Sequence, residues 1–272
     1  MNRYLKLFLG FLVFSSLIVS CDVIPEGEKT VIVENINAVR PVLLEDYTGQ
    51  NCINCPRAAA RATEIKKALG DNLIIVSIHT GIFSTRQFRT DAGQAYQEYF
   101  YPSNEAYPAG MIDRTVFDGD RVSTNDSKWG TYILKRAQEL TLPKFELILS
   151  ADYDPENKSF NVNVQGKGFE EIKNAKLQLW VTESHIIASQ KAVGETIRDY
   201  EHNHVLRDAI NGIWGSDVEI NANTNYQFNY RSEAYSMASK DWIVENMHIV
   251  GFIYDSETQG VLYVKEIPLK NQ

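Results

Sequence analysis

Two cysteines separated by two residues, Cys52 and Cys55, have the type and spacing of a redox dithiol. They lie directly before a segment whose apolar residues recur at helical spacing until Gly70, which predicts a helix of about four turns. At the start of a helix, unpaired backbone N–H groups and the helix dipole favour negative charge. Such a position can lower a cysteine pKa from about 8.5 to roughly 3.5–7.5. We therefore expect an exposed Cys52 to act as the nucleophile and Cys55 as the resolving thiol.

The apolar runs and turn signals of residues 41–143 predict the elements that position this pair. In chain order they are a strand at 42–44, the helix after the cysteines, a strand at 73–78, a helix at 87–100, a strand at 109–117, a turn at Asp118–Gly119, a strand near 121–123, and a helix that begins at Asn125 or Asp126 and ends before Pro143. This order of strands and helices resembles the thioredoxin fold.

Two further residues match the thioredoxin family by position. Asp46 lies six positions before Cys52, where that family carries a buried acid that serves as proton acceptor for the resolving cysteine. Pro108 lies just before the third predicted strand, where the family carries a cis-proline that faces the dithiol and guides the substrate. The resemblance therefore implies catalytic roles for Asp46 and Pro108. The sequence departs from the family at Ile53–Asn54, which replace a Gly-Pro dipeptide, so no reduction potential can be assigned.

After Pro143 the apolar pattern changes from helical spacing to strict alternation, which is typical of half-buried strands. The simplest architecture for such strands is an antiparallel β-sandwich of immunoglobulin-like type. We therefore expect an α/β thioredoxin-like domain over residues 36–143 and an all-β sandwich domain over residues 144–272.

The N-terminus has the layout of a bacterial lipoprotein signal. Residues 1–20 carry two positive charges and an apolar run too short to span a bilayer, and Ile18–Cys21 resembles a lipobox. We expect cleavage before Cys21, lipidation of Cys21, and a tether over residues 21–35. Loss of the two positive charges changes the formal net charge from -8 to -10, which argues against nucleic acid as a partner.

The CxxC motif has three other interpretations. It could be a static disulfide between Cys52 and Cys55, as an oxidising compartment would maintain. It could be a relic on a binding scaffold. It could also form half of a zinc site with His202 and His204, although these histidines are spaced more closely than in structural zinc sites and lie in the other predicted domain. No cofactor and no metal are predicted.

Other candidate residues have simpler explanations. Charged residues surround His202 and His204, so we expect polar contacts in a loop there, with local salt bridges and domain docking. His79, at the end of the second strand, is expected to be a satisfied strand-end histidine. Several aromatic residues are expected around the Pro108 loop, where they could line a peptide groove or form core; they are Phe83, Tyr99, Phe100, Tyr101 and Tyr107.

Three segments carry a closer resemblance: Leu44–Pro56, Tyr107–Pro108 leading to Ile112–Arg114, and His202–Arg207. Together they resemble the outer-membrane-protein-28-related lipoproteins of Bacteroidetes. The resemblance implies a membrane-anchored lipoprotein with a thioredoxin-like half and a β-rich half, most simply at the outer membrane.

Two functional hypotheses follow. In the first, the protein exchanges disulfides with envelope protein thiols through Cys52 and Cys55. In the second, the β-sandwich binds a surface ligand, as an adhesion protein would, and the disulfide is structural.

Overall fold

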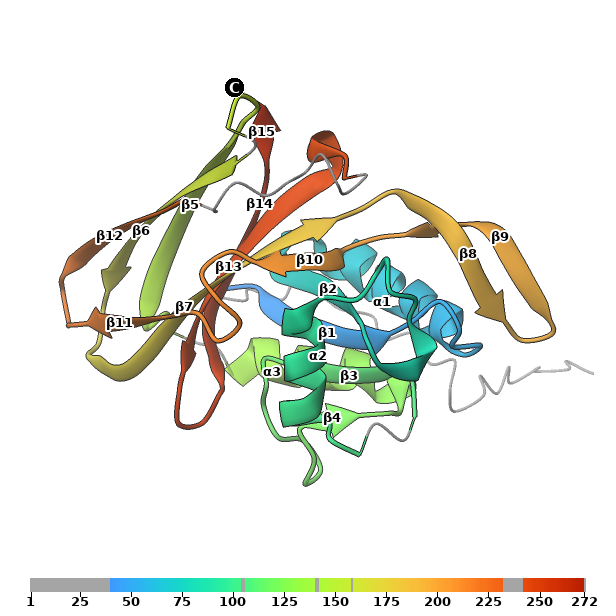
Figure 1. Cartoon of the computed structure of the whole chain (residues 1–272). Coiled ribbons are helices and arrows are strands. Elements are labelled where there is room, and N and C mark those ends of the chain that lie inside the picture. Colours follow the sequence, from blue (N-terminus) through green and yellow to red (C-terminus); the bar gives the residue numbers. More distant parts are fainter. Residues whose placement is uncertain (1–39, 104–105, 140–141, 158, 232–241, 272) are drawn as a thin grey trace, which may run out of the picture. The chain divides into compact units, whose positions relative to one another are not determined.

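The computed structural model of the protein describes residues 40–103, 106–139, 142–157, 159–231 and 242–271. Within these residues, strands form a mixed nine-stranded sheet, a four-stranded sheet and a two-stranded ribbon (Figure 1). The elements of the N-terminal part are β1 (Val42–Thr48), α1 (Cys55–Leu69), β2 (Leu73–His79), α2 (Asp91–Phe100), β3 (Ala109–Ile112), β4 (Val122–Ser123) and α3 (Trp129–Glu139). Those of the C-terminal part are β5 (Phe145–Asp154), β6 (Ser159–Gly168), β7 (Ile172–Glu183), β8 (Ile186–Ala192), β9 (Glu195–His202), β10 (Val205–Ala209), β11 (Ser216–Ile220), β12 (Asn225–Arg231), β13 (Met247–Asp255), β14 (Val261–Pro268) and β15 (Lys270–Asn271).

The N-terminal part has the element order predicted from the sequence. Strand β1 pairs in parallel with β2, from Val42 opposite Leu73 to Thr48 opposite His79, and it pairs antiparallel with β3. Successive side chains of a strand point to opposite faces of the sheet. Accordingly, Val42 and Leu44 pack against α1 and α3, whereas Leu43 packs in the cluster that contains α2.

Two predicted boundaries need correction. The second helix begins at Asp91 and not at residue 87, because Thr90 is its N-cap and its hydroxyl accepts a hydrogen bond from Gly93 N at 2.9 Å. The third strand ends at Ile112 and not at residue 117. Asp113 and Arg114 both have positive φ angles, 46° and 53°, which a strand does not allow.

The large sheet runs through both parts of the chain. Its order is β14-β13-β7-β10-β2-β1-β3-β4, with β11 paired to β7. Strand β10 joins the two parts, because it pairs in parallel with β2, where Val205 lies opposite Ser77, and antiparallel with β7. The sheet therefore crosses the boundary predicted between residues 143 and 144.

Alternation after Pro143 predicts half-buried strands, and β5 shows them clearly. Phe145, Leu147 and Leu149 are buried, whereas the residues between them are exposed. The apolar face of β5 and β6 packs against β7, β11 and β13 of the large sheet and forms one core cluster with them. Two packed β layers are thus present in the C-terminal part of the chain.

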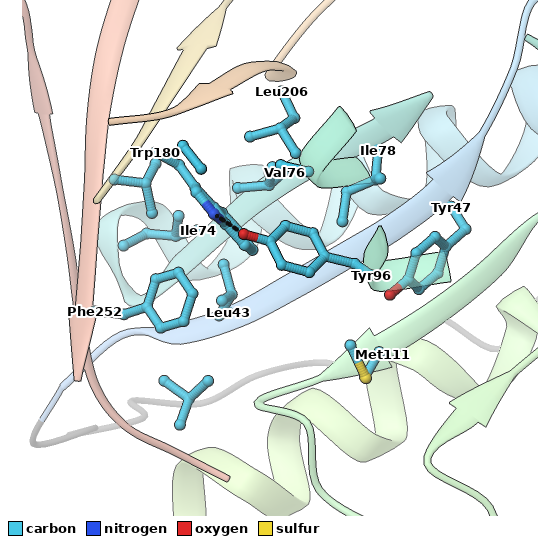
Figure 2. Packing of buried hydrophobic residues seen from close by; sticks show 14 of the residues in the cluster. Leu43, Tyr47, Ile74, Val76, Ile78, Tyr96, Met111, Trp180, Leu206 and Phe252 are labelled. Atoms are coloured by element: carbon cyan, nitrogen blue, oxygen red, sulfur yellow. Dashed lines mark hydrogen bonds between the residues drawn. The ribbon is translucent and has the colours of Figure 1, made fainter. Parts of the chain in front are cut away.

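A second core cluster joins the helix α2 to strands from both parts of the chain (Figure 2). Tyr96 of α2 lies over the sheet, and its hydroxyl accepts a hydrogen bond from Nε1 of Trp180, on β7, at 2.9 Å. The Tyr96 hydroxyl also donates to the carbonyl of Ile213. The ring of Phe252, on β13, packs edge-on to Trp180 at 4.6 Å between centroids. Helix α2 therefore contacts strands of the C-terminal part as well as strands of the N-terminal part.

A buried ion pair lies in the same region. Nε of Arg114 donates to Oε1 of Glu45, on β1, at 2.8 Å, and neither side chain is more than 1% exposed. The guanidinium carbon lies 4.8–5.7 Å from the centroids of five rings, those of Tyr96, Phe100, Trp180, Phe252 and Tyr254. Burial raises the pKa of Glu45, and the positive charge of Arg114 acts in the opposite direction.

Candidate functional site

The cysteine pair lies where the sequence predicts it, between β1 and the first turn of α1. Cys52 and Cys55 form a disulfide. Helix α1 begins at Cys55 and has proline in its first turn, where a missing N–H is tolerated. The turn before the pair is closed by a hydrogen bond of 3.0 Å from Cys52 N to Gly49 O. The disulfide thus lies at the amino end of α1, where unpaired backbone N–H groups and the helix dipole favour a thiolate.

Gly49 is required by close packing of this turn. A Cβ atom on Gly49 would lie 2.4 Å from the carbonyl oxygen of Phe83. The same carbonyl accepts a hydrogen bond from Asn51 N at 2.8 Å. The segment 81–83 therefore supports the cysteine turn from one side, and only glycine fits at the contact.

The expectation of an exposed Cys52 is wrong. Cys52 is 3% exposed and Cys55 is 2% exposed. Both belong to the core cluster that also contains Tyr47 and Tyr107, and strand β8 of the C-terminal part contacts the backbone of Cys52. Contacts with residues remote in the sequence bury the pair.

Asp46 lies on β1, immediately below the turn. It is 2% exposed, and its Oδ1 has no hydrogen-bond partner among the described residues. Burial raises the pKa of Asp46 to about 7, with a smaller contribution from the negative charge of Asp126. A carboxyl group with this pKa can both accept and donate a proton near neutral pH.

Pro108 lies at the start of β3, next to the same strand. The Tyr107–Pro108 peptide bond is cis, as the resemblance to thioredoxins implies. The register pairs Tyr47 with Ala109 and Asp46 with Gly110, so Pro108 adjoins the carboxyl end of β1. The pKa of Tyr107 is raised, mainly by burial and partly by the charges of Tyr101 and Asp46. The predicted acid and the predicted proline are thus near neighbours.

A cavity of about 220 Å³ lies beside Cys55, one of the two disulfide cysteines. Residues from β1, α1, β2 and β9 line it, among them Asp46, Cys55, Ser77, His79, Tyr200 and His202. The cavity therefore brings Asp46 and Cys55 together and adds residues of the C-terminal part. The negative charge of Asp46 contributes, after burial, to a raised pKa of Tyr200.

His79 and His202 face each other at this cavity, with ring centroids 5.4 Å apart. Burial lowers the pKa of His79 well below its usual value and that of His202 to about 4. His79 Nδ1 and His202 Nε2 have no hydrogen-bond partner among the described residues, so the expectation that His79 is satisfied is wrong. Over the same residues, no group of three His, Cys, Asp or Glu side chains is placed to hold a metal ion.

The loop expected around His202 and His204 is confirmed only in part, because it is limited to Asn203 and His204. His202 ends β9, and His204 lies in the turn before β10 with a φ of 56°. Arg207 pairs with a residue of another strand: its Nε donates to Glu183 Oε2, on β7, at 2.7 Å. The segment after His204 forms a strand, β10, because it pairs with the edge of β2.

The aromatic residues expected around the Pro108 loop divide into two groups. Phe83 and Tyr101 pack on Tyr107, with centroids 5.2 and 6.4 Å away. Tyr99 and Phe100 pack on Trp214 of the C-terminal part at 5.2 and 6.2 Å. Only the first group lies beside the cysteine turn.

Comparisons with known proteins place the chain among outer membrane proteins. The model of the family described as outer membrane protein Omp28 matches residues 93–272, more than half of the chain. The chain therefore belongs to the Omp28 family. The predicted membership of this family is confirmed, and so is the predicted outer-membrane location. No curated protein matches the chain.

Solved structures extend this comparison. HBP35 of Porphyromonas gingivalis has the same fold, with a TM-score of 0.68 at 15% identity over 85% of this chain and 75% of that chain. A domain of the outer membrane lipoprotein Omp28 from Porphyromonas gingivalis is 26% identical over 48% of this chain and 93% of that chain, with a TM-score of 0.35. Over the described residues, no helix is both long and apolar enough to cross a membrane.

Proposed function

We propose that this protein is a lipid-anchored outer membrane protein that exchanges disulfides with thiols of envelope proteins. One observation carries the proposal: the Cys52–Cys55 disulfide lies at the start of α1, and Cys55 lines the same cavity as the buried, unpaired carboxyl group of Asp46. A dithiol, a helix amino end and an acid with a pKa of about 7 are the groups that thiol–disulfide exchange requires.

The domain organisation is part of the proposal. We assign residues 36–143 to a thioredoxin-like domain, which the element order from β1 to α3 supports. We assign residues 144–272 to an immunoglobulin-like sandwich, which the packing of β5 and β6 on β7 and β13 supports.

In the proposed reaction, Cys52 is the nucleophile of the reduced protein. Its thiolate attacks one sulfur of a partner disulfide, which forms a mixed disulfide and releases the other partner sulfur as a thiolate. Asp46 then accepts the thiol proton of Cys55, and the Cys55 thiolate attacks Cys52 Sγ. The Cys52–Cys55 bond forms, the second partner sulfur leaves, and two electrons have passed to the partner. The reverse sequence oxidises a partner dithiol.

Trapping tests this reaction. The Cys55→Ser variant, reduced and incubated with envelope extract, should accumulate mixed disulfides at Cys52, whereas Cys52→Ser should not. The wild-type protein should also catalyse insulin reduction in the presence of a thiol reductant. A protein that is inert in both assays, although folded, is not an exchange enzyme.

The burial of both cysteines favours a second candidate function, in which the β-sandwich binds a surface ligand and the disulfide is structural. A Cys52→Ser/Cys55→Ser protein should then retain its binding to cell-surface or matrix proteins. Loss of binding in a folded double variant would count against this function.

Lipid anchoring at Cys21 is a separate proposal, since that residue lies outside the described part of the chain. The mass of the intact protein purified from membranes should include acyl chains on Cys21, and Cys21→Ser should release the protein from the membrane. An unmodified N-terminus in the membrane-derived protein contradicts the anchor.

A further inference from the structure

Strand β8 contains one buried side chain, Gln190, in a ribbon whose other residues, except His202 at the end of β9, are exposed or half-buried. The β8–β9 ribbon extends away from the large sheet near α1 (Figure 1), and two of its apolar residues, Ile187 and Val193, are 59% and 74% exposed. Gln190 is only 2% exposed. The pairing register of β8 with β9 shifts between Ala188 and Gln190, and such irregularities redirect side chains. The position of Gln190 therefore needs an explanation.

The amide of Gln190 binds the turn that carries Cys52. Its Nε2 donates to Cys52 O at 2.9 Å and lies 3.3 Å from Gly49 O, the acceptor at the other end of that turn. It also donates to Lys191 O at 3.0 Å. One amide group, placed 138 residues further along the chain than Cys52, thus bridges the two ends of the cysteine turn.

A main-chain contact reinforces this bridge. Lys191 N donates to Gln50 O, inside the same turn, at 2.8 Å. On its other side the turn rests on Phe83, whose carbonyl contacts Gly49 and Asn51. The cysteine turn is therefore held between the segment 81–83 and β8, and β8 is the side that belongs to the C-terminal part of the chain.

We propose that the β8–β9 ribbon is an integral part of the redox site and that Gln190 is a positioning residue, which holds the cysteine turn in its disulfide conformation. The inference goes beyond the proposed function, because it requires only that the disulfide can be reduced. It applies equally to an exchange enzyme and to a binding protein whose disulfide responds to the surroundings.

The contact should be stronger in the disulfide form because the cysteine turn then has less conformational freedom. The disulfide restricts the backbone of residues 52–55, so Gln190 meets a carbonyl that is already in place. In the dithiol form the backbone of residues 52–55 is less restricted. Binding of Gln190 must then fix this backbone at a cost in conformational entropy, so the hydrogen bond of Gln190 to Cys52 O is weaker. By reciprocity, a contact that favours the disulfide is itself favoured by the disulfide to the same factor. Reduction should therefore loosen β8 from the turn.

The first experiment measures the Cys52–Cys55 equilibrium in glutathione redox buffers. A net hydrogen bond changes an equilibrium by about two- to twelvefold. Gln190→Met, which keeps the size but removes the donor, should lower the equilibrium constant for disulfide formation at least threefold, or about 14 mV for a two-electron couple. Gln190→Glu, which replaces the donor with an acceptor, should lower it further. Gln227→Met, at an exposed position on β12, should match the wild type.

The second experiment needs no variant. Hydrogen exchange of the oxidised and reduced wild-type protein should show at least threefold faster exchange of the Lys191 amide after reduction, with unchanged rates in β12. Equal rates in both redox states, or a Gln190→Met protein with the wild-type equilibrium constant, would overturn the inference. Failure of both mixed-disulfide trapping and insulin reduction would remove the enzyme function but would leave both of these measurements unaffected.

Discussion

Asp46 and Cys55 line the same cavity, although one lies on β1 and the other in the first turn of α1. The chain reverses between them through the turn at Gly49, which brings the helix start over the carboxyl end of the strand. The Asp46 carboxyl group is buried and its Oδ1 is unpaired, so its proton affinity is set mainly by the absence of water.

The first prediction concerns the pH dependence of stability at Asp46. Burial raises its pKa from the ordinary 3.8 to about 7, so between these values the folded protein holds a proton that the unfolded chain has lost. This contribution to stability is present at low pH and is lost as the pH rises to about 7. Between pH 5 and pH 8, the wild-type protein should lose roughly 3 kcal/mol relative to Asp46→Asn in urea denaturation. An equal difference at both pH values contradicts the raised pKa.

The second prediction concerns His202, whose contribution to stability has the opposite pH dependence to that of Asp46. Burial lowers the pKa of His202 to about 4, so below its usual pKa of 6.5 the unfolded chain binds a proton that the folded protein does not. Stability is complete above about pH 6.5 and decreases as the pH falls. His202→Phe keeps a ring against Phe88, and from pH 7.5 to pH 5 it should lose about 2 kcal/mol less than the wild type. Parallel pH profiles of thermal unfolding would be the contrary result.

The third prediction concerns the buried pair of Glu45 and Arg114. Arg114→Met leaves a carboxylate buried without its partner, which should reduce the free energy of unfolding by about 3–5 kcal/mol. Glu45→Gln in the same protein should recover part of this loss. Lys144→Met, which breaks an exposed pair with Glu170, should cost about 1 kcal/mol or less. Additive effects of the two changes at Glu45 and Arg114 would show that the pair is not coupled.

The fourth prediction compares alanine substitutions of two glycines, Gly49 and Gly130, with opposite expected effects on stability. Gly49→Ala places a Cβ 2.4 Å from Phe83 O, so the cysteine turn must shift, and we expect a loss of at least 2 kcal/mol with greater exposure of Cys52 to alkylating reagents after reduction. Gly130→Ala, inside α3, meets only Ile65 at 3.6 Å or more and should stabilise the protein by about 0.5–1 kcal/mol. Thermal melting and alkylation rates distinguish the two outcomes. A Gly49→Ala protein as stable as the wild type refutes the close contact.

Local patterns predicted much of this molecule. Apolar spacing placed the helix after Cys55, and alternation marked Phe145, Leu147 and Leu149 as one buried face. These signals are reliable because they depend on neighbours within a few residues. The cis bond at Pro108 was anticipated only through the resemblance to thioredoxins, since no local pattern distinguishes a cis proline.

The β8–β9 ribbon and Gln190 were missed for the opposite reason. The ribbon is largely polar and exposed, so its strands lack a clear apolar alternation. A glutamine in such a segment has no local mark of burial, because its partners Gly49 and Cys52 lie in the other part of the chain. The error in the exposure of Cys52 has the same origin.

The sequence by itself determined that two cysteines precede a helix, that an acid lies six residues before them, and that the chain after Pro143 forms half-buried strands. Only the tertiary structure decided that β10 pairs with β2 and that β8 contacts the cysteine turn. The physical reason is the separation along the chain over which each kind of interaction acts. Periodicity and turn chemistry act between neighbours in the chain, whereas burial of a sulfur or a carboxyl group depends on residues that only folding brings into contact.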